Sequence, residues 1–292
     1  MKRVFVYFIV LVMVICLFSG CDGSSANSAS KNPGTNAAAG SEIVHETEPI
    51  ELIAAVTSSP GSLFPYGVPR GGKKAIRGML YEPLFWVDDQ SRLCPILAKS
   101  YEYIGDGVYQ VTLFDYIKDS AGNDLKASDV IYSLDLLIDD GFALAAVSSL
   151  TDYREIDDYT VEFIFADAKM GSFEKLVTSL YCITRSAWET RSEDMTSTPV
   201  VGTGRYELAD CVESSWYKFE KRSNYWQTDE SYICAKNEAK VDTFTLEIIT
   251  DSSTIAVALE KGEIDYTQNI DQPDRANFMN PDGTARDGYV LK

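Results

Sequence analysis

The chain has 292 residues, of which 45% are apolar and 12% aromatic, and it carries a formal net charge of −18. This composition excludes a globally disordered chain and provides enough apolar side chains for one large folded domain or two ordinary ones. The acidic balance repels nucleic acid and anionic lipid headgroups, so we exclude nucleic-acid binding and attachment to a membrane through a basic surface.

The N-terminus has the pattern of a bacterial export signal. Two basic residues precede an almost wholly apolar run from Val4 to Phe18, and a run of about fifteen residues is short for a membrane span but typical of a secretory signal. Ser19-Gly20-Cys21 resembles the lipobox of bacterial lipoproteins, although Phe18 stands where leucine is usual. We predict a signal peptide over residues 1–20 and a lipid anchor on Cys21. The alternative is an ordinary signal with an incidental cysteine.

The segment that follows is predicted to be a tether. Asp22 to Glu42 contains no aromatic residue and is dominated by Gly, Ser, Ala and Asn. Such a segment cannot offset its ordering entropy by burial. Residues 21–48 are therefore expected to form the lipid anchor and a flexible leash ahead of the folded part.

The sequence lacks the residues of most catalytic sites. Its only histidine, His45, lies in the predicted leash, which excludes histidine triads and multi-histidine metal sites from the folded part. Adjacent acidic pairs such as Asp88-Asp89 and Asp157-Asp158 leave a two-carboxylate glycosidase as an alternative. We favour turns for these pairs, and we expect no catalytic residue, metal site or cofactor.

Four cysteines follow the predicted anchor, at Cys94, Cys182, Cys211 and Cys234. None of them forms a C-x-x-C pair, so a zinc ribbon or a thioredoxin-type site is not supported. They could form two disulfides with three possible connectivities, or they could all be free thiols.

The folded part begins with Ile50–Val56, an apolar run suited to a buried strand. A loop rich in Pro, Gly and Ser follows, and it carries exposed-looking Leu63, Phe64 and Tyr66. The spacing of apolar residues and the positions of turn-forming residues then predict further helices and strands. These are helices over residues 73–81, 127–138 and 172–180, a strand over 84–87, and hairpins formed by 101–104 with 108–114 and by 153–156 with 159–165.

The stretch VVGTGRYELAD, residues 200–210, contains a glycine pair that could signal a phosphate-binding loop. The residues after Gly204 alternate between apolar and polar through Ala209, and Trp216–Arg222 alternate again after a Glu-Ser-Ser turn. This period of two predicts a β-hairpin, whereas a phosphate loop needs a helix after its glycines. The nucleotide-binding interpretation therefore fails.

The last predicted elements are a strand over residues 241–249, a helix over 252–261 and a strand over 264–266. The helix should be capped by Asp251 or Ser252 and closed by Gly262. Strands that alternate with helices and hairpins predict an α/β or α+β fold with a mixed sheet.

Read in order, these segments resemble family 5 of the extracytoplasmic solute-binding proteins of ABC importers, which includes oligopeptide, dipeptide and nickel binders. LFDYIKDSAGNDLKASDV is similar to the family's L-R-D-G-V-K-F-x-D-G-x-P-L-T-A-x-D-V motif. The matching positions are Leu113, Asp115, Lys118, Gly122, Leu125, Ala127, Asp129 and Val130, whereas Phe114, Tyr116, Asp119, Ala121 and Lys126 depart from it.

Further segments carry the same resemblance. MLYEPLFWVDDQSRLCPILAKS resembles the family's helix, "YEPL" and "P-x-LA-x-S" series. VGTGRYEL with FEKRSNYW is similar to "GTGPY" followed by "N-x-x-YW", and VDTFTLEIITDSSTIAVALEKGEID resembles the segment that ends in "GEID". The likeness extends from about residue 50 to about residue 270.

The resemblance implies a periplasmic-binding-protein type II fold, which has two lobes and an α+β domain inserted in the first. It places lobe one at residues 49–83 and 187–270, the additional domain at 84–186, and a truncated start of lobe two at 271–292. Because family members are much longer, we expect a fragment or a truncated member whose second lobe is missing.

The resemblance also implies a role without bond chemistry. The chain would be a membrane-anchored, extracytoplasmic monomer that captures short peptides, or a nickel chelate or oligosaccharide, and delivers them to the permease subunits of an ABC importer. The alternative is a truncated surface lipoprotein with impaired or no solute binding. The expected lobe-one wall consists of Ser59, Leu63, Phe64, Gly202, Thr203, Gly204 and Tyr206. The alternative for each of these residues is plain loop or core packing.

Overall fold

A computed structural model of the chain describes residues 48–66, 71–140, 144–166, 171–191, 200–233 and 238–291. The predicted signal peptide and Cys21 lie outside the described residues, as do almost all of the predicted tether and Cys234. The structure therefore does not test the predictions of a signal peptide, a lipid anchor and a flexible tether.

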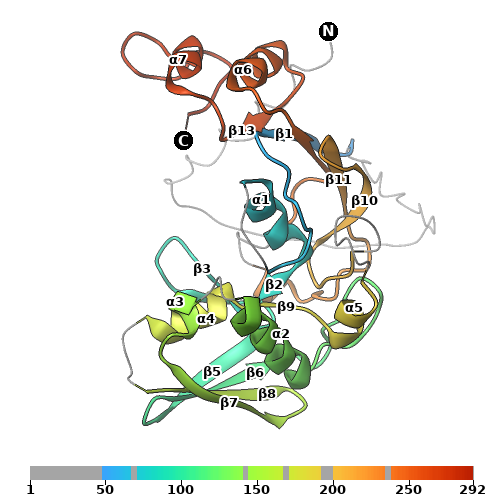
Figure 1. Cartoon of the computed structure of the whole chain (residues 1–292), viewed down its shortest axis with the longest axis vertical. Helices are drawn as coiled ribbons and strands as arrows, with labels where there is room; N and C mark the ends of the chain where they lie inside the picture. The colour runs from blue at the N-terminus through green and yellow to red at the C-terminus, as the bar shows by residue number, and fades with distance from the viewer. Residues whose placement is uncertain are drawn as a thin grey trace, which may run out of the picture. The chain divides into compact units, whose positions relative to one another are not determined.

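A five-stranded mixed sheet contains both the first strand of the chain and the last ones (Figure 1). β1 pairs in parallel with β12 and β13, and β11 runs antiparallel to β10 and β12. In spatial order the strands are β10 (Tyr206–Val212), β11 (Trp216–Lys221), β12 (Thr243–Ile248), β1 (Glu51–Val56) and β13 (Tyr266–Thr267).

β1 is buried on both faces, which explains its continuous apolar sequence. Ala54 and Val56 pack into the large core on one face, whereas Ala55 packs with Ile255 and Ala258 of α6 (Ser252–Lys261) on the other. Strands covered on both faces lose the alternation of apolar and polar residues that marks a half-exposed strand.

A four-stranded antiparallel sheet forms the middle of the chain. In spatial order its strands are β5 (Ala98–Gly105), β6 (Val108–Leu113), β8 (Thr160–Phe165) and β7 (Leu150–Asp157). Val111, Val161 and Phe163 point to the covered face and are fully buried. α2 (Ala127–Asp140) lies beside β7 and β8 on that face.

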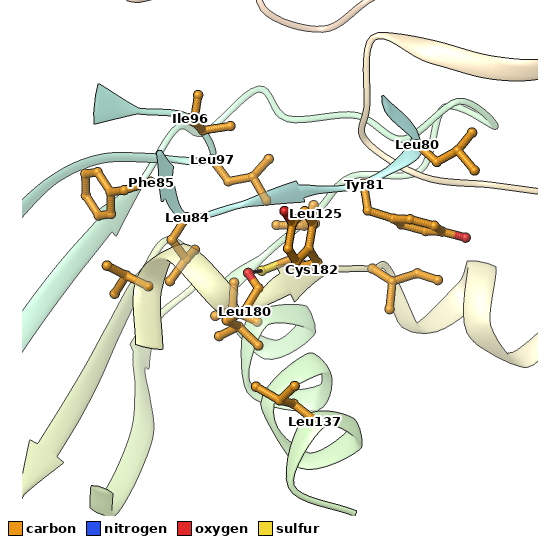
Figure 2. Packing of buried hydrophobic residues seen from close by; sticks show 14 of the residues in the cluster. Leu80, Tyr81, Leu84, Phe85, Ile96, Leu97, Leu125, Leu137, Leu180 and Cys182 are labelled. Carbon is orange, nitrogen blue, oxygen red and sulfur yellow. Dashed lines mark hydrogen bonds between the residues drawn. The ribbon is translucent and has the colours of Figure 1, made fainter. Parts of the chain in front are cut away.

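Two short strands carry the chain between these sheets. β2 (Glu82–Pro83) leaves α1 (Gly71–Leu80), and β9 (Tyr181–Cys182) returns with Cys182 opposite Glu82. β3 (Phe85–Val87) pairs with β4 (Leu93–Pro95) immediately after the crossing. One apolar core continues through this region, and Figure 2 shows Leu84 and Cys182 between Leu97 and Leu137 of α2.

The remaining helices are short. They are α3 (Leu144–Val147), α4 (Ser172–Ser179), α5 (Arg185–Glu189), α7 (Gln272–Arg275) and the 3-10 turns η1 (Glu230–Tyr232) and η2 (Ala276–Phe278).

The predicted elements that fall on described residues are present with shifts of a few residues at their ends. α6 spans residues 252–261 as predicted, with Asp251 Oδ1 accepting from Thr254 N at 2.8 Å and Gly262 at φ 68°. Lys126, which departs from the family's threonine cap, precedes a helix that begins at Ala127. Asp129 supplies the return hydrogen bond of a capping box, because its Oδ2 accepts from Lys126 N at 2.9 Å, whereas Asp129 N donates to the backbone oxygen of Lys126.

Candidate functional site

Ser59 lies beyond the carboxyl edge of the five-stranded sheet. β1 and β12 are parallel with Val56 opposite Ile248, so both strands end at this edge. Ser59 is half-buried, and its Oγ lies 3.3 Å from the hydroxyl of Tyr217. In open α/β sheets, ligands bind outside the carboxyl ends of parallel strands, which makes this edge a candidate position for a solute.

Leu63 and Phe64 are not exposed, contrary to the expectation from the loop composition. Their side chains are 2% and 7% exposed. The ring centroid of Phe64 lies 4.2 Å from that of Trp188 and 6.3 Å from that of Tyr81. Tyr66 is buried as well. The loop turns these side chains inward because burial in an aromatic cluster stabilises them, and their contact with a solute stays a prediction.

The two glycines of the Gly202–Gly204 loop lie against the C-terminal end of α1. A Cβ atom on Gly202 would meet Leu80 O at 2.1 Å, and one on Gly204 would meet Met79 O at 2.0 Å. Gly204 N donates to Leu80 O at 2.9 Å. The glycines are therefore needed for close approach of backbone to backbone within the chain itself. A role in contacting a solute stays a prediction.

Thr203 and Tyr206 also make their contacts within the chain. Thr203 is fully buried, and its hydroxyl has no hydrogen-bond partner among the described residues. Tyr206 begins β10, and its hydroxyl donates to Val241 O at 2.8 Å.

The predicted wall residues do not converge on one surface. Tyr206 pairs with Lys221, at the edge of the sheet where β1 and β12 begin. Ser59 lies beyond the opposite edge, where β1 and β12 end. Phe64 and Gly202 are brought together instead, because both lie against Tyr81.

A buried arginine that we did not single out from the sequence holds the glycine loop. Arg222 is 4% exposed and follows β11. Its Nη1 donates to Gly204 O at 3.0 Å and to Gly202 O at 3.3 Å, and its Nη2 donates to Asp119 O at 3.1 Å. One side chain thus joins the five-stranded sheet to the loop between β6 and α2.

The Asp119 carboxylate orders that loop. It is 1% exposed and accepts from the backbone of Ala121 and Asn123 at 3.0 and 2.9 Å. It also accepts from the Asn123 side chain at 2.8 Å and from Thr184 Oγ1 at 2.7 Å. Asp119 departs from the family motif in the sequence, and the structure makes this residue the centre of the loop.

The Glu82 carboxylate ties the crossing strand β2 to the segment after β11. It is 2% exposed, and it accepts from the hydroxyl of Tyr225 at 2.5 Å and from Nε1 of Trp226 at 3.1 Å. Burial raises the pKa of Glu82 to about 7, although these two hydrogen bonds and the charges of Arg205 and Arg222 act in the opposite direction.

We call Glu82, Asp119, Arg222, Tyr225 and Trp226 the junction network. Its members come from segments up to 144 residues apart, as between Glu82 and Trp226. The FEKRSNYW and YEPL motifs were visible signals for four of these residues, but nothing local to either motif indicates that they meet. The arrangement binds protein groups to one another and presents no catalytic pair.

The described part of the chain contains neither a metal-binding cluster of side chains nor a membrane-spanning helix. There, no group of three or more His, Cys, Asp or Glu side chains could hold a metal ion. None of the helices described has the length and hydropathy to cross a bilayer. Cys182 is a buried free thiol, so the alternative with two disulfides among the four cysteines does not hold.

Comparison with known proteins gives a family match over most of the chain. The family model described as bacterial extracellular solute-binding proteins, family 5 Middle, matches residues 92–288. This match covers the four-stranded sheet, the junction network apart from Glu82, and most of the five-stranded sheet.

Curated relatives include the glutathione-binding protein GsiB of Escherichia coli K12, which is 28% identical over 222 residues. The GsiB of Shigella boydii is 28% identical over 221 residues. In both cases the alignment covers 74% of this chain and 41% of the relative, so the chain spans less than half the length of these relatives.

Solved structures share the fold. The murein tripeptide-binding protein MppA of Escherichia coli has a TM-score of 0.69 at 17% identity, covering 80% of this chain and 48% of that one. The oligopeptide-binding protein AppA of Bacillus subtilis, in complex with a nonapeptide, has a TM-score of 0.64 at 18% identity, with coverages of 79% and 46%. NikA of Brucella suis, in complex with Fe(III)-EDTA, has a TM-score of 0.62 at 22% identity, with coverages of 73% and 42%. The fold is therefore that of a type II periplasmic binding protein, as the sequence predicted.

Proposed function

Because the chain belongs to the bacterial extracellular solute-binding proteins of family 5, we propose that it is the solute-capturing part of an ABC importer. In this proposal it binds short peptides outside the cytoplasm, delivers them to the permease subunits and performs no bond chemistry. Relatives named for glutathione, murein tripeptide and oligopeptide binding support the peptide class. NikA, in complex with Fe(III)-EDTA, supports a metal chelate as the second candidate.

The observation that carries the proposal is the carboxyl edge of the parallel strands. β1, β12 and β13 all end there, and Ser59 stands just beyond the end of β1. The hydroxyl of Thr267, at the end of β13, bonds within the chain, because it donates to Ala55 O and accepts from Asn269 N. Hydroxyl and backbone groups at such an edge suit recognition of a peptide main chain, because they bind it without regard to its side chains.

We infer that lobe one comprises residues 49–83 and 187–270 and that residues 84–186 form the additional α+β domain. The five-stranded sheet lies within the first set, and the four-stranded sheet lies within the second. We further infer that residues 271–292 begin lobe two. A second wall is needed to remove water from a ligand, so lobe one by itself should bind peptides weakly.

Isothermal titration of residues 22–292 with pooled di- to pentapeptides tests the proposal. We expect weak, saturable heat that diminishes when Ser59 is replaced by alanine and is unchanged in Ser253→Ala, an exposed serine of α6. Absence of saturable binding would favour the alternative, a truncated surface lipoprotein without solute capture. Turnover of a chromogenic glycoside would favour the carbohydrate-active alternative.

We propose separately that Cys21 carries the lipid that anchors the protein to the outer face of the cytoplasmic membrane. The support is the signal-like run before Cys21 and the lipobox-like Ser19-Gly20-Cys21. Metabolic labelling with a fatty-acid probe should mark the wild-type chain and leave Cys21→Ala unlabelled. Equal labelling of both proteins would contradict the anchor.

A further inference from the structure

The Glu82 carboxyl group occupies an unusual position for a buried acid. No described Lys or Arg nitrogen lies within ion-pair distance of it. Its two direct partners, the Tyr225 hydroxyl and the Trp226 indole, are neutral donors. A buried carboxylate without a paired cation favours its protonated form.

Two arginines lie nearby without pairing with it. The guanidinium of Arg205 stacks over the ring of Tyr225 at 4.0 Å, and its Nε and Nη2 are buried without a hydrogen-bond partner among the described residues. Arg222 donates to backbone carbonyls instead. Positive charge is therefore available to a carboxylate at Glu82 once that carboxylate forms.

The thiol and phenol groups around Glu82 stay protonated, and therefore uncharged, at neutral pH. Cys182 lies opposite it on β9, and burial, with the charges of Asp129 and Glu82, raises the pKa of that thiol. Burial, followed by the Glu82 charge, raises the pKa of Tyr225. Tyr81, the residue before Glu82, also has its pKa raised by burial.

From this geometry we propose that Glu82 is a proton-sensitive tie between the crossing strand β2 and the Tyr225–Trp226 segment. In the protonated state Tyr225 and Trp226 hold a neutral carboxyl group, and Arg205 rests on the Tyr225 ring. Loss of the proton leaves a buried carboxylate, which strengthens both hydrogen bonds and draws the unpaired N–H groups of Arg205 toward it. The β2–β9 crossing thereby responds to pH, which is the pH outside the cytoplasm if the proposed function holds.

Nitrogen-15 NMR of the tryptophan indoles tests the tie, because the sequence has only four tryptophans. Trp226→Phe identifies the Trp226 signal. In a titration from about pH 5 to about pH 9, that signal should shift with a midpoint near 7, as the pKa of Glu82 predicts. The shift should be lost in Glu82→Gln, while the other three indole signals show that this variant is folded.

His45, the only histidine, is removed by His45→Gln in every sample, so that its titration cannot contribute. Arg205→Gln leaves Glu82 and both of its donors in place and removes one positive charge, so the midpoint should move to higher pH. A Trp226 signal that does not shift in this range would overturn the proposal. So would a shift that persists in Glu82→Gln, or a midpoint that Arg205→Gln leaves unchanged or lowers.

Discussion

The two sheets of this protein are built in different ways. In the four-stranded sheet, β5 pairs with β6 and β7 with β8 across tight turns, and the covered face is apolar. In the five-stranded sheet, β1 pairs with β12 although Glu51 and its partner Thr243 are far apart in the sequence. The five-stranded sheet therefore relies on contacts between distant segments, and several of these contacts are buried and polar.

The largest expected effect comes from removing the arginine of the junction network. Arg222→Met should lower the free energy of unfolding by about 4 kcal/mol, because buried carbonyls of Gly204 and Asp119 lose their charged donor. Urea unfolding measures the loss. Hydrogen exchange should show that protection falls in β10–β12 more than in β5–β8.

Lys221→Met is the matched control, since that neighbouring side chain is 41% exposed and its loss should change the stability by less than about 0.5 kcal/mol. An equal loss in the two variants would show that the buried polar contacts do not distinguish the sheets.

The next effect comes from the glycine loop. Gly204→Ala places a Cβ atom 2.0 Å from Met79 O and should cost about 3 kcal/mol, because backbone must move to make room. Gly78→Ala in α1 is the control, since its Cβ would lie 3.5 Å from the Trp86 ring, an ordinary contact. There alanine should leave the stability unchanged or raise it by up to about 1 kcal/mol. Thermal melts of both variants measure these changes in stability. A Gly204→Ala variant as stable as the wild type would refute the close approach of Gly204 to the backbone of α1.

Glu82 predicts a pH dependence whose sign follows from its raised pKa. Between about pH 4.5 and about pH 7 the folded protein holds a proton at Glu82 that the unfolded chain has released, so this contribution to stability is lost as the pH rises through 7. The total amounts to about 3 kcal/mol.

Urea unfolding of Glu82→Gln and wild type at several pH values isolates that contribution. We expect the variant to gain stability relative to wild type as the pH rises, with little difference at about pH 4. A difference independent of pH would mean that Glu82 is ionised throughout. Glu162 of the four-stranded sheet differs from Glu82 in its partners. It is also buried, at 4% exposed, but it forms an ion pair with Arg154 and accepts a hydrogen bond from Gln110.

The smallest expected effect lies in a helix that the sequence alone predicted. Asp251→Ala removes the cap of α6 and should cost about 1 kcal/mol, whereas Asp251→Asn should keep most of the stability because asparagine caps equally well. Chemical denaturation of the two variants gives the comparison. Equal losses would show that the side-chain hydrogen bond to Thr254 N does not stabilise the helix.

Local elements were predictable because their signals are local. The glycines at 105 and 107 and the alternation on either side predicted the first hairpin, and Gly262 predicted the end of α6. The family motifs then predicted the fold. Residues whose role depends on distant partners could not be assigned: nothing near Asp119 or Glu82 in the sequence indicates that Arg222 or Trp226 lies beside them.

The candidate site shows the same limit. Ser59 was placed correctly in the loop after the first strand, but composition alone made Leu63 and Phe64 look exposed, since the aromatic partner Trp188 is 124 positions further along the chain. The glycines of Gly202–Gly204 suggested approach to a peptide backbone. In the structure they approach the backbone of α1, and their contact with a peptide backbone stays a prediction.

Solute capture at the carboxyl edge of the parallel strands is tested most directly by backbone amide NMR during titration with short peptides. We predict saturable shifts confined to the residues that follow β1, β12 and β13, such as Ser59 and Asn269, with the amides of β5–β8 unmoved. Saturable shifts located elsewhere, or no shifts with any peptide, would contradict it.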